Sequence, residues 1–263
     1  MIYAIGDIHG QKAMLDHALA LIEADGGRDA EIVFLGDYTD RGPDSKGVLD
    51  TLIAGRDAGR NWHFVKGNHD RMFHDFVRAG REHDSRVKSG ISWINRRLGG
   101  ITTLASYGLK GDPSFLHPRG GGRETLASYA IGTETLTPAE VQAEAARIVP
   151  DAHLDFIADL PLWHEAGDLL FVHAGLRPGV ALEDQQEDDL IWIRDDWLED
   201  RRDHGWLVIH GHTALDFPRH HGNRVNLDGG AGYGNPLHPA RIEGRAVTLL
   251  TVDGEIPLSP DAA

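Results

Sequence analysis

Several residue types and patterns are absent or scarce in this chain of 263 residues. Cysteine is absent, which excludes disulfides and thiolate metal ligands and fits a reducing, cytoplasmic location. No apolar run reaches membrane-spanning length, and the first residues lack a basic segment and an apolar core, so we expect no membrane association and no signal peptide. Basic residues number 26 against 41 acidic ones. Because nucleic-acid binding needs a basic surface, we expect no nucleic-acid partner.

The residues that are present suffice for one large α/β domain covering residues 1–263. Of the chain, 41% is hydrophobic, which is enough for a substantial core. Short apolar runs alternate three times with helical periodicity near the N-terminus, which predicts a parallel βαβαβ unit. The expected strands are 2–5, 32–35 and 62–65, and the expected helices are 11–24, 45–54 and 71–79. A second sheet is predicted from the expected strands 169–172, 206–209, 224–227 and a closing strand 246–252.

Residues 80–160 differ in character from the segments on either side. Clear strand patterns vanish, and we interpret the segment as an inserted, mostly helical lid beside the site, because it is too poor in apolar residues for a core of its own. Thr137-Pro138-Ala139-Glu140 predicts a helix start with a capping box. The glycine run 120–122 is expected to form a loop, residues 183–189 a solvated acidic run, and the residues after Leu258 a frayed end.

Polar residues follow the apolar runs at several places. Gly36-Asp37-Tyr38-Thr39-Asp40-Arg41-Gly42 comes directly after an expected strand, so Asp37 should emerge at the edge where open α/β sheets place their ligand sites. An isolated D-x-x-D-R would more simply be a solvated loop. It is not isolated, because five strand ends together present Asp7 and His9, Asp37, Asn68 and His69, His173, and His212.

This combination of side chains predicts a metal centre. Carboxylate, imidazole and amide oxygen suit borderline divalent ions such as Mn²⁺, Fe²⁺ or Zn²⁺. The ligands are too many for one ion, so we expect two ions about 3.5–4 Å apart, bridged by a water and by one carboxylate, for which Asp37 is the natural candidate.

Taken in order, these motifs resemble the phosphoprotein phosphatase family of calcineurin-like metallophosphoesterases, and most closely its small bacterial and bacteriophage serine/threonine phosphatases. The motifs that carry the resemblance are Gly6-Asp7-Ile8-His9-Gly10, residues 36–42, Gly67-Asn68-His69-Asp70, His173-Ala174-Gly175-Leu176 and Gly211-His212-Thr213. They span residues 6–213. The resemblance implies a β-sandwich of two mixed sheets flanked by helices, and a two-metal site that most often uses manganese.

The resemblance also implies a role for individual residues. For the first metal it implies the ligands Asp7, His9 and Asp37, and for the second Asp37, Asn68, His173 and His212. It implies that His69 is the general acid and that Asp40 orients it. It also implies that Arg41 and Arg194 bind the phosphate oxygens. The implied reaction is hydrolysis of phosphoserine or phosphothreonine in a protein or peptide, by direct attack of a metal-bridging hydroxide. A monomer is compatible with the sequence.

Two positions depart from the family pattern. The third motif ends in Asp70 rather than Glu, and we expect Asp70 to support the loop rather than a metal. Ala214 stands where broader metallophosphoesterases often carry His, which favours the phosphoprotein phosphatase branch and leaves His210 with a supporting or structural role. The other histidines are interpreted as ordinary core or surface residues, namely His17, His63, His74, His83, His117, His153, His164, His204, His220, His221 and His238.

Two alternatives to a protein phosphatase stay open. One is a hydrolase of diadenosine tetraphosphate, although that branch usually has Ala at the position of Asp40. The other is a non-catalytic, metal-stabilised binding module, which would normally lack a ligand or the acid. Neither the lid nor residues 228–239 carry a readable specificity code. A basic cluster in the lid is either a solvated face or an attraction for acidic phosphopeptide, and it comprises Arg81, Arg86, Lys88, Arg96 and Arg97.

Overall fold

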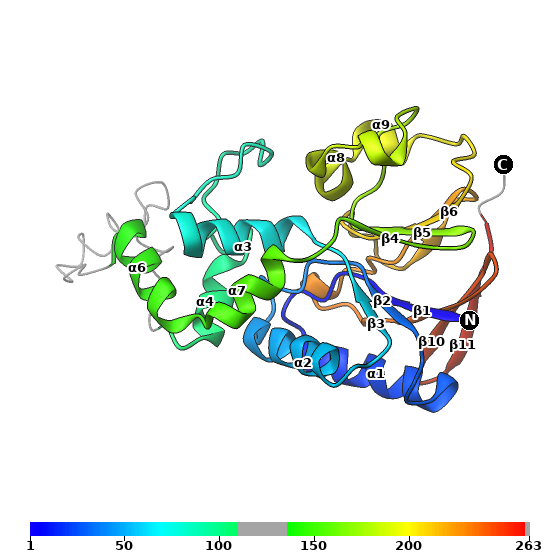
Figure 1. Cartoon of the computed structure of the whole chain (residues 1–263), viewed down its shortest axis with the longest axis horizontal. Coiled ribbons are helices and arrows are strands. Elements are labelled where there is room, and N and C mark those ends of the chain that lie inside the picture. Colours follow the sequence, from blue (N-terminus) through cyan, green and yellow to red (C-terminus); the bar gives the residue numbers. More distant parts are fainter. Residues whose placement is uncertain (110–135, 261–263) are drawn as a thin grey trace.

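The computed structural model describes residues 1–109 and 136–260. In this part of the chain, two mixed β-sheets pack face to face, with helices against their outer faces (Figure 1). The first sheet has the order β11-β10-β9-β1-β2-β3. Its strands are β1 (Ile2–Ile5), β2 (Ile32–Phe34), β3 (Trp62–Phe64), β9 (Ala240–Glu243), β10 (Ala246–Thr251) and β11 (Gly254–Leu258). The predicted fold class is confirmed.

The second sheet has the order β4-β5-β6-β8-β7. Its strands are β4 (Trp163–Ala166), β5 (Leu169–Val172), β6 (Leu207–His210), β7 (Arg219–His220) and β8 (Arg224–Asn226). The central pairs β5–β6 and β6–β8 are parallel. Their carboxyl ends therefore lie at one edge, where they face the ends of the first sheet's parallel strands.

The N-terminal half forms the predicted βαβαβ unit. Strands β1, β2 and β3 pair in parallel, and α1 (Lys12–Gly26) and α2 (Ser45–Asp57) connect them. Alternate strand residues face opposite sides, as the two-residue period of a strand requires. Phe34 faces the helices, whereas Val33 and Leu35 face the second sheet. The result is a helix-covered core and a separate core between the two sheets.

The lid packs on the helix-covered core. Its described helices are α4 (Gly100–Ser106), α6 (Pro138–Ile148) and α7 (Asp151–Ala158). Val141 of α6 and Ile157 of α7 belong to the same apolar cluster as Phe76 of α3 (Asn68–Ala79). At the start of α6, Glu140 N donates to Thr137 Oγ1 and Thr137 N donates to the Glu140 carboxylate, which is the predicted capping box. The predicted glycine loop 120–122 and His117 lie outside the described residues.

Other elements differ from the prediction. Strands β4 and β9 were not predicted: Trp163–Ala166 alternates poorly between apolar and polar residues, whereas Ala240–Glu243 does alternate but is only four residues long. The predicted closing strand is not the last one, since β10 turns back into β11. Helix α3 begins at Asn68 rather than at residue 71. The motif residues 68–70 therefore form its first turn, and Gly67 N donates a hydrogen bond to Asp70 Oδ2 at 3.1 Å.

The acidic run 183–189 is only partly solvated. It contains the 3-10 turn η2 (Leu182–Asp184) and begins helix α8 (Glu187–Trp192), and short helix α9 (Asp195–Leu198) follows. Asp189 is buried and accepts hydrogen bonds from Arg177 Nε at 2.9 Å and Nη2 at 2.5 Å. Figure 1 shows α8 and α9 against the outer face of the second sheet. Among the described residues, no helix is long and apolar enough to cross a lipid bilayer.

Candidate metal centre and active site

Polar side chains gather where the parallel strands of both sheets end. Asp7, Asp37 and Asn68 lie a few residues after the ends of β1, β2 and β3, while His173 and His212 follow β5 and β6. All five side chains are buried. Because the carboxyl ends of parallel strands share an edge, residues far apart in the sequence meet here. The structure thus brings together the side chains that were predicted as metal ligands.

Asp37 lies at the centre of this group. Its Oδ2 is 3.5 Å from His9 Nε2, and its Oδ1 is 3.4 Å from His173 Nε2. Two sets of side chains could each hold an ion, with ligand atoms within 4.8 Å of one another: His9, Asp37 and His69, and Asp37, His173 and His212. Only Asp37 is common to both sets, as a carboxylate that bridges two ions must be.

Carbonyl groups orient two of the imidazoles. His9 Nδ1 lies 2.8 Å from the carbonyl of Thr39, and His173 Nδ1 lies 2.8 Å from that of Leu35. A carbonyl can only accept, so each Nδ1 carries the proton and each Nε2 presents a lone pair to the site. Asn68 completes this half of the site, because its Oδ1 is 3.0 Å from His173 Nε2.

The buried carboxylates and imidazoles of the site would be stabilised by bound cations. Burial, together with the carboxylates of Asp228 and Asp37, raises the pKa of Asp7 well above its usual range. Burial would also raise the pKa of Asp37, but the imidazoles of His173, His69 and His9 lower it below its usual range. Burial lowers the pKa of His212, and its Nε2 is buried without a hydrogen-bond partner among the described residues. Imidazole nitrogens and crowded carboxylates are a donor set that fits divalent metal ions.

Backbone strain is concentrated at the same place. Within the described chain, the non-glycine residues with positive φ are His9, Asp37, Asp40, Arg41 and His212. Each such residue costs on the order of 1–2 kcal/mol relative to a relaxed backbone. A close approach adds a further restraint at Gly211, where any Cβ would overlap Asp7 Oδ1. Holding these side chains in position therefore lowers the stability of the folded state.

His69 and Asp40 form a buried pair beside the metal ligands. His69 Nδ1 lies 2.6 Å from Asp40 Oδ2, which orients the ring and leaves Nε2 facing the site. Trp93 Nε1 donates to the same Asp40 oxygen at 2.8 Å, and the Thr103 hydroxyl donates to the other at 2.8 Å. Although His69 is close enough to His9 and Asp37 to be a ligand, a carboxylate on Nδ1 suits an imidazole that carries and releases a proton.

Two arginines face an open groove beside this pair. The groove has a volume of about 500 Å³. Arg41 Nη2 lies 3.1 Å from His69 Nε2, and Arg194 Nη2 is 3.5 Å from the carbonyl of His212. Both side chains line the groove, as do Arg86 and Lys88 of the lid. The groove can therefore receive a phosphate group against cationic side chains.

The family model for calcineurin-like phosphoesterases matches residues 1–233 of this chain. The chain belongs to the calcineurin-like phosphoesterase family. The match covers every strand end described above. It fits a metal-dependent hydrolase of phosphate esters, which is the chemistry that the family's name denotes.

Curated relatives of this phosphoesterase carry two kinds of name. The chain is 26% identical to the asymmetrical bis(5'-nucleosyl)-tetraphosphatase PrpE of Geobacillus thermodenitrificans, over 98% of this chain and 96% of the relative. It is also 26% identical to serine/threonine-protein phosphatase 1 of Salmonella typhimurium, over 92% of each chain. The second likeness supports the resemblance to phosphoprotein phosphatases.

Solved structures show the same fold. A candidate diadenosine tetraphosphatase superposes with a TM-score of 0.60 at 20% identity, covering 98% of this chain and 93% of that one. A cold-active protein-tyrosine phosphatase of Shewanella superposes with a TM-score of 0.55 at 16% identity, covering 98% and 80%. At these identities the likeness concerns the architecture of the phosphoesterase fold.

The structure adds residues that sequence reasoning missed. Asp228 is buried beside Asp7 and follows β8, but the sequence Arg224-Val225-Asn226-Leu227 before it is not an apolar run, so the signal of the other strand ends is missing. Trp93 and Thr103 bind Asp40 from the lid, for which the sequence offers no signal. The ring of Tyr233 lies 4.8 Å from the Arg41 guanidinium.

The supporting residues agree with expectation. Asp70 accepts hydrogen bonds from Tyr38 N at 2.9 Å and Gly67 N at 3.1 Å, so it holds the loop. His210 is buried beside Trp197, with Nδ1 3.1 Å from the carbonyl of Gly211, and burial lowers its pKa to about 3. Both contacts are structural.

Proposed function

We propose that this phosphoesterase hydrolyses phosphoserine and phosphothreonine in proteins or peptides, with two divalent ions. Manganese is the metal that we expect, and iron and zinc are compatible with the same ligands. The pairing of His69 with Asp40 supports this choice more than any other feature. An alkoxide leaving group is strongly basic and needs a proton as the P–O bond breaks, whereas a phosphate leaving group needs little help.

Each side chain has a task in this reaction. Bound to Asp7, His9, Asp37, Asn68, His173 and His212, the two ions would supply hydroxide at neutral pH and offset phosphate charge. Arg41 and Arg194 bind the phosphate oxygens and hold the phosphorus in line for attack. His69 donates its Nε2 proton to the departing oxygen, and Asp40 holds the ring and stabilises its positive charge before transfer.

The lid supplies one wall of the substrate groove in this proposal. Residues 1–263 act as a single catalytic domain, with the segment 80–160 placing Arg86 and Lys88 beside Arg41. A phosphorylated peptide with acidic neighbours would find local attraction there. A purely binding module is disfavoured, because every predicted ligand and the acid are present and buried together.

A second candidate is asymmetric hydrolysis of dinucleoside tetraphosphates. Relatives from Geobacillus and Anoxybacillus are named for this activity. The basic side chains Arg86 and Lys88 could hold additional phosphates along the groove. We rank this activity second because its leaving group is a nucleotide phosphate. Such a leaving group needs little protonation, so the reaction would not use the His69–Asp40 pair.

A comparison of substrates with Mn²⁺ tests both candidates. We expect wild-type enzyme to have a higher kcat/KM on a phosphoseryl peptide than on diadenosine tetraphosphate. His69→Asn should lower turnover of the peptide by roughly 10²–10⁴-fold and that of p-nitrophenyl phosphate much less, because p-nitrophenolate is a weak base. His74→Asn, on the same helix, is the matched control and should change neither.

Two results would count against the proposal. Equal losses on both monoesters would show that His69 is not the general acid. Cleavage of the dinucleotide a hundredfold better than the peptide, equivalent to about 2.7 kcal/mol of transition-state stabilisation, would establish the second candidate instead.

A further inference from the structure

A third cluster of metal-type side chains lies outside the active site. Glu31, His63 and His164 each offer one ligand atom, and these atoms lie within 4.8 Å of one another. His63 Nε2 is 3.4 Å from Glu31 Oε1. The two imidazole rings stack with centroids 4.0 Å apart and planes 16° apart. Both histidines had been interpreted as ordinary residues, and the proposed reaction uses none of the three.

The cluster joins the edges of the two sheets. β3 is the edge strand of the first sheet and β4 that of the second. His63 pairs with Val33 and His164 pairs with Phe171, and both partners face the core between the sheets. Glu31 precedes Val33 by two residues and so points to the same side. The three side chains therefore close one rim of the inter-sheet core.

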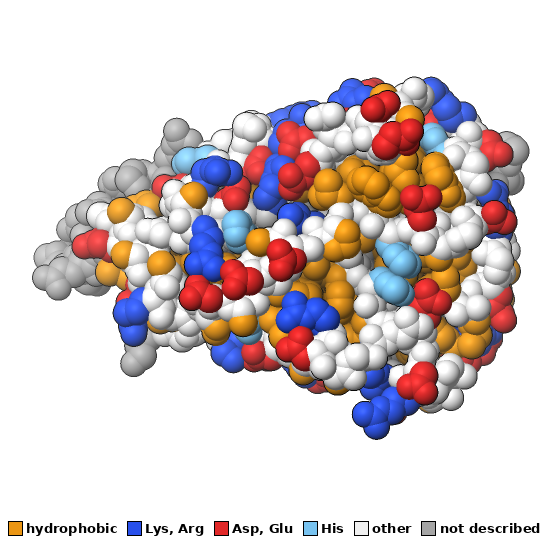
Figure 2. All heavy atoms as spheres, in the orientation of Figure 1, with side chains coloured by type: hydrophobic (Ala, Val, Ile, Leu, Met, Phe, Trp, Pro, Cys, Tyr) orange, Lys and Arg blue, Asp and Glu red, His pale blue; other side chains and the backbone are white. Residues whose placement is uncertain are grey.

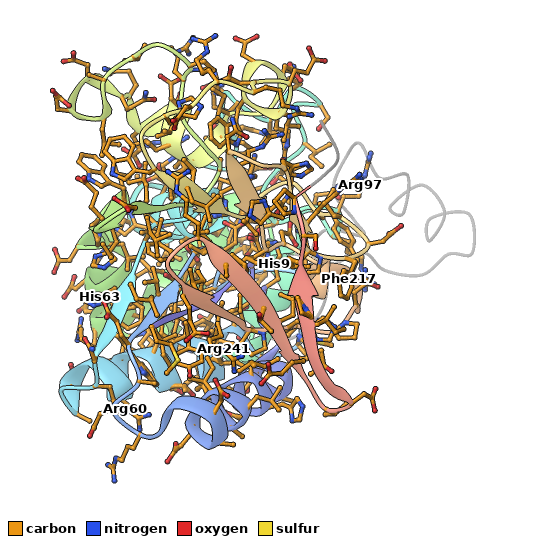
Figure 3. All side chains as sticks on the ribbon, turned by 90° about the vertical axis from the view of Figure 1, so that its right-hand side faces the viewer. His9, Arg60, His63, Arg97, Phe217 and Arg241 are labelled. Carbon is orange, nitrogen blue, oxygen red and sulfur yellow. The ribbon has the colours of Figure 1, made fainter. Side chains whose placement is uncertain are left out.

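This rim is remote from the metal centre. Glu31 precedes β2 and Asp37 follows it, so six residues of mostly extended chain, roughly 20 Å, separate them. Figure 3 shows His63 at the surface and His9 in the interior, well apart. Figure 2 shows histidine side chains exposed over the sheet edges, where Figure 1 places β3 and β4. An ion here would be open to solvent on one side.

The donor set suits zinc. Two imidazole nitrogens and one carboxylate oxygen are a recurrent set of three protein ligands for Zn²⁺, with water in the fourth position. In a tetrahedral site with bonds of about 2.0–2.1 Å, ligand atoms lie about 3.4 Å apart, which is the separation of His63 Nε2 and Glu31 Oε1. The other ligand atoms lie within 4.8 Å of one another, so the side chains would rotate to bring them onto one ion.

His164 is in the state that a ligand needs. Its Nε2 is buried and has no hydrogen-bond partner among the described residues. Burial and the neighbouring His63 lower the pKa of His164, so its ring is neutral at pH 7. A buried, unpaired ring nitrogen is costly unless it meets water or an ion.

We propose that Glu31, His63 and His164 bind one Zn²⁺ ion, which joins the edge strand of one sheet to that of the other. The ion would stabilise the sandwich at its open rim. It takes no part in phosphate chemistry.

Zinc content measured by equilibrium dialysis at fixed free Zn²⁺ tests this assignment. With the two active-site ions, wild-type protein should bind about three Zn²⁺ per chain, and His164→Ala about two. Loss of a direct ligand should weaken this site by roughly 100-fold or more, since loss of an outer partner alone costs 10–100-fold. Glu31→Gln should act in the same direction, and His17→Ala, an exposed histidine on α1, should behave as wild type.

Cadmium NMR separates this site from the metal centre. Wild-type protein loaded with ¹¹³Cd²⁺ should show a resonance that His17→Ala keeps and that both His164→Ala and Glu31→Gln lose. Activity on p-nitrophenyl phosphate should be the same in all four proteins, so the result does not depend on the proposed substrate. Equal zinc content in wild type and His164→Ala, or an unchanged cadmium spectrum, would overturn the assignment.

Discussion

At the scale of single residues, the position of the proposed general acid depends on contacts from the lid. Asp40 Oδ2 lies 2.6 Å from His69 Nδ1 and accepts from Trp93 Nε1 at 2.8 Å, while Thr103 holds Oδ1. Trp93 is buried and is not among the residues that line the substrate groove. In the proposed reaction it would act through Asp40, as a positioning residue.

Trp93→Phe should therefore impair catalysis in a selective way. A hydrogen bond to a charged group contributes about 1.5–3 kcal/mol, so partial loss of Asp40 alignment should lower kcat on alkyl phosphates roughly tenfold, with KM unchanged. Turnover of p-nitrophenyl phosphate should change little. The measurement is kcat against leaving-group pKa, with Trp206→Phe as the control. An equal loss on every substrate would indicate general damage to the fold.

At the scale of elements, a buried histidine ties the lid to the first α/β unit. His153 on α7 has its Nε2 3.0 Å from Asp50 Oδ1 on α2, and its Nδ1 lies 2.7 Å from the Tyr107 hydroxyl, just after α4. A carboxylate only accepts, so Nε2 carries the proton and the tyrosine donates to Nδ1. Burial lowers the pKa of His153, although Asp50 opposes this.

This pKa predicts how stability depends on pH. The unfolded chain, with a histidine pKa near 6.5, binds the proton more readily than the folded chain. The free energy of unfolding should therefore fall as pH drops below about 6.5, because protonation favours the unfolded state. His153→Gln should show a smaller fall between pH 6.5 and 5 in urea titrations. The exposed His83→Gln should match wild type, and an unchanged slope in His153→Gln would refute the assignment.

At the scale of the whole molecule, an acidic chain concentrates buried carboxylates at one edge of a sandwich. The formal net charge is −15, and Asp7, Asp37 and Asp228 are buried together. Burial raises the pKa of Asp228 to about 6. Cations bound there should stabilise the entire fold, because both sheets contribute ligands.

Manganese should consequently raise the melting temperature as well as restore activity after chelation. At 100 times its Kd, one ion adds about 2.7 kcal/mol, which corresponds to roughly 5–10 °C for a chain of this size. Calorimetry with and without Mn²⁺ measures the shift, and sodium chloride at matched ionic strength should give almost none. Elemental analysis at saturation should find about two Mn²⁺ per chain, and a single ion would contradict the two-metal proposal.

The sequence by itself determined the metal-binding edge of the first sheet. Apolar runs followed by Gly-Asp or Gly-Asn mark the ends of β1, β2 and β3, and the alternation with helices makes those strands parallel. Parallel strands in a βαβ unit must end at the same edge, so Asp7, Asp37 and Asn68 converge wherever this pattern folds. His173 and His212 could be assigned because their strands are also apolar runs, and these lead into histidine and glycine.

Only the tertiary structure decided which distant elements meet around that edge. Trp93 reaches Asp40, Asp228 lies against Asp7, and Glu31 joins His63 and His164 across two sheets. Nor does the sequence indicate the positive φ of Asp40 and the other strained residues, which the surrounding packing imposes. Local sequence patterns give the period and direction of each strand. Burial of apolar surface is non-directional, so it does not specify which strands or helices pack together. The contacts between the sheet edges and the lid therefore depend on how the entire chain packs.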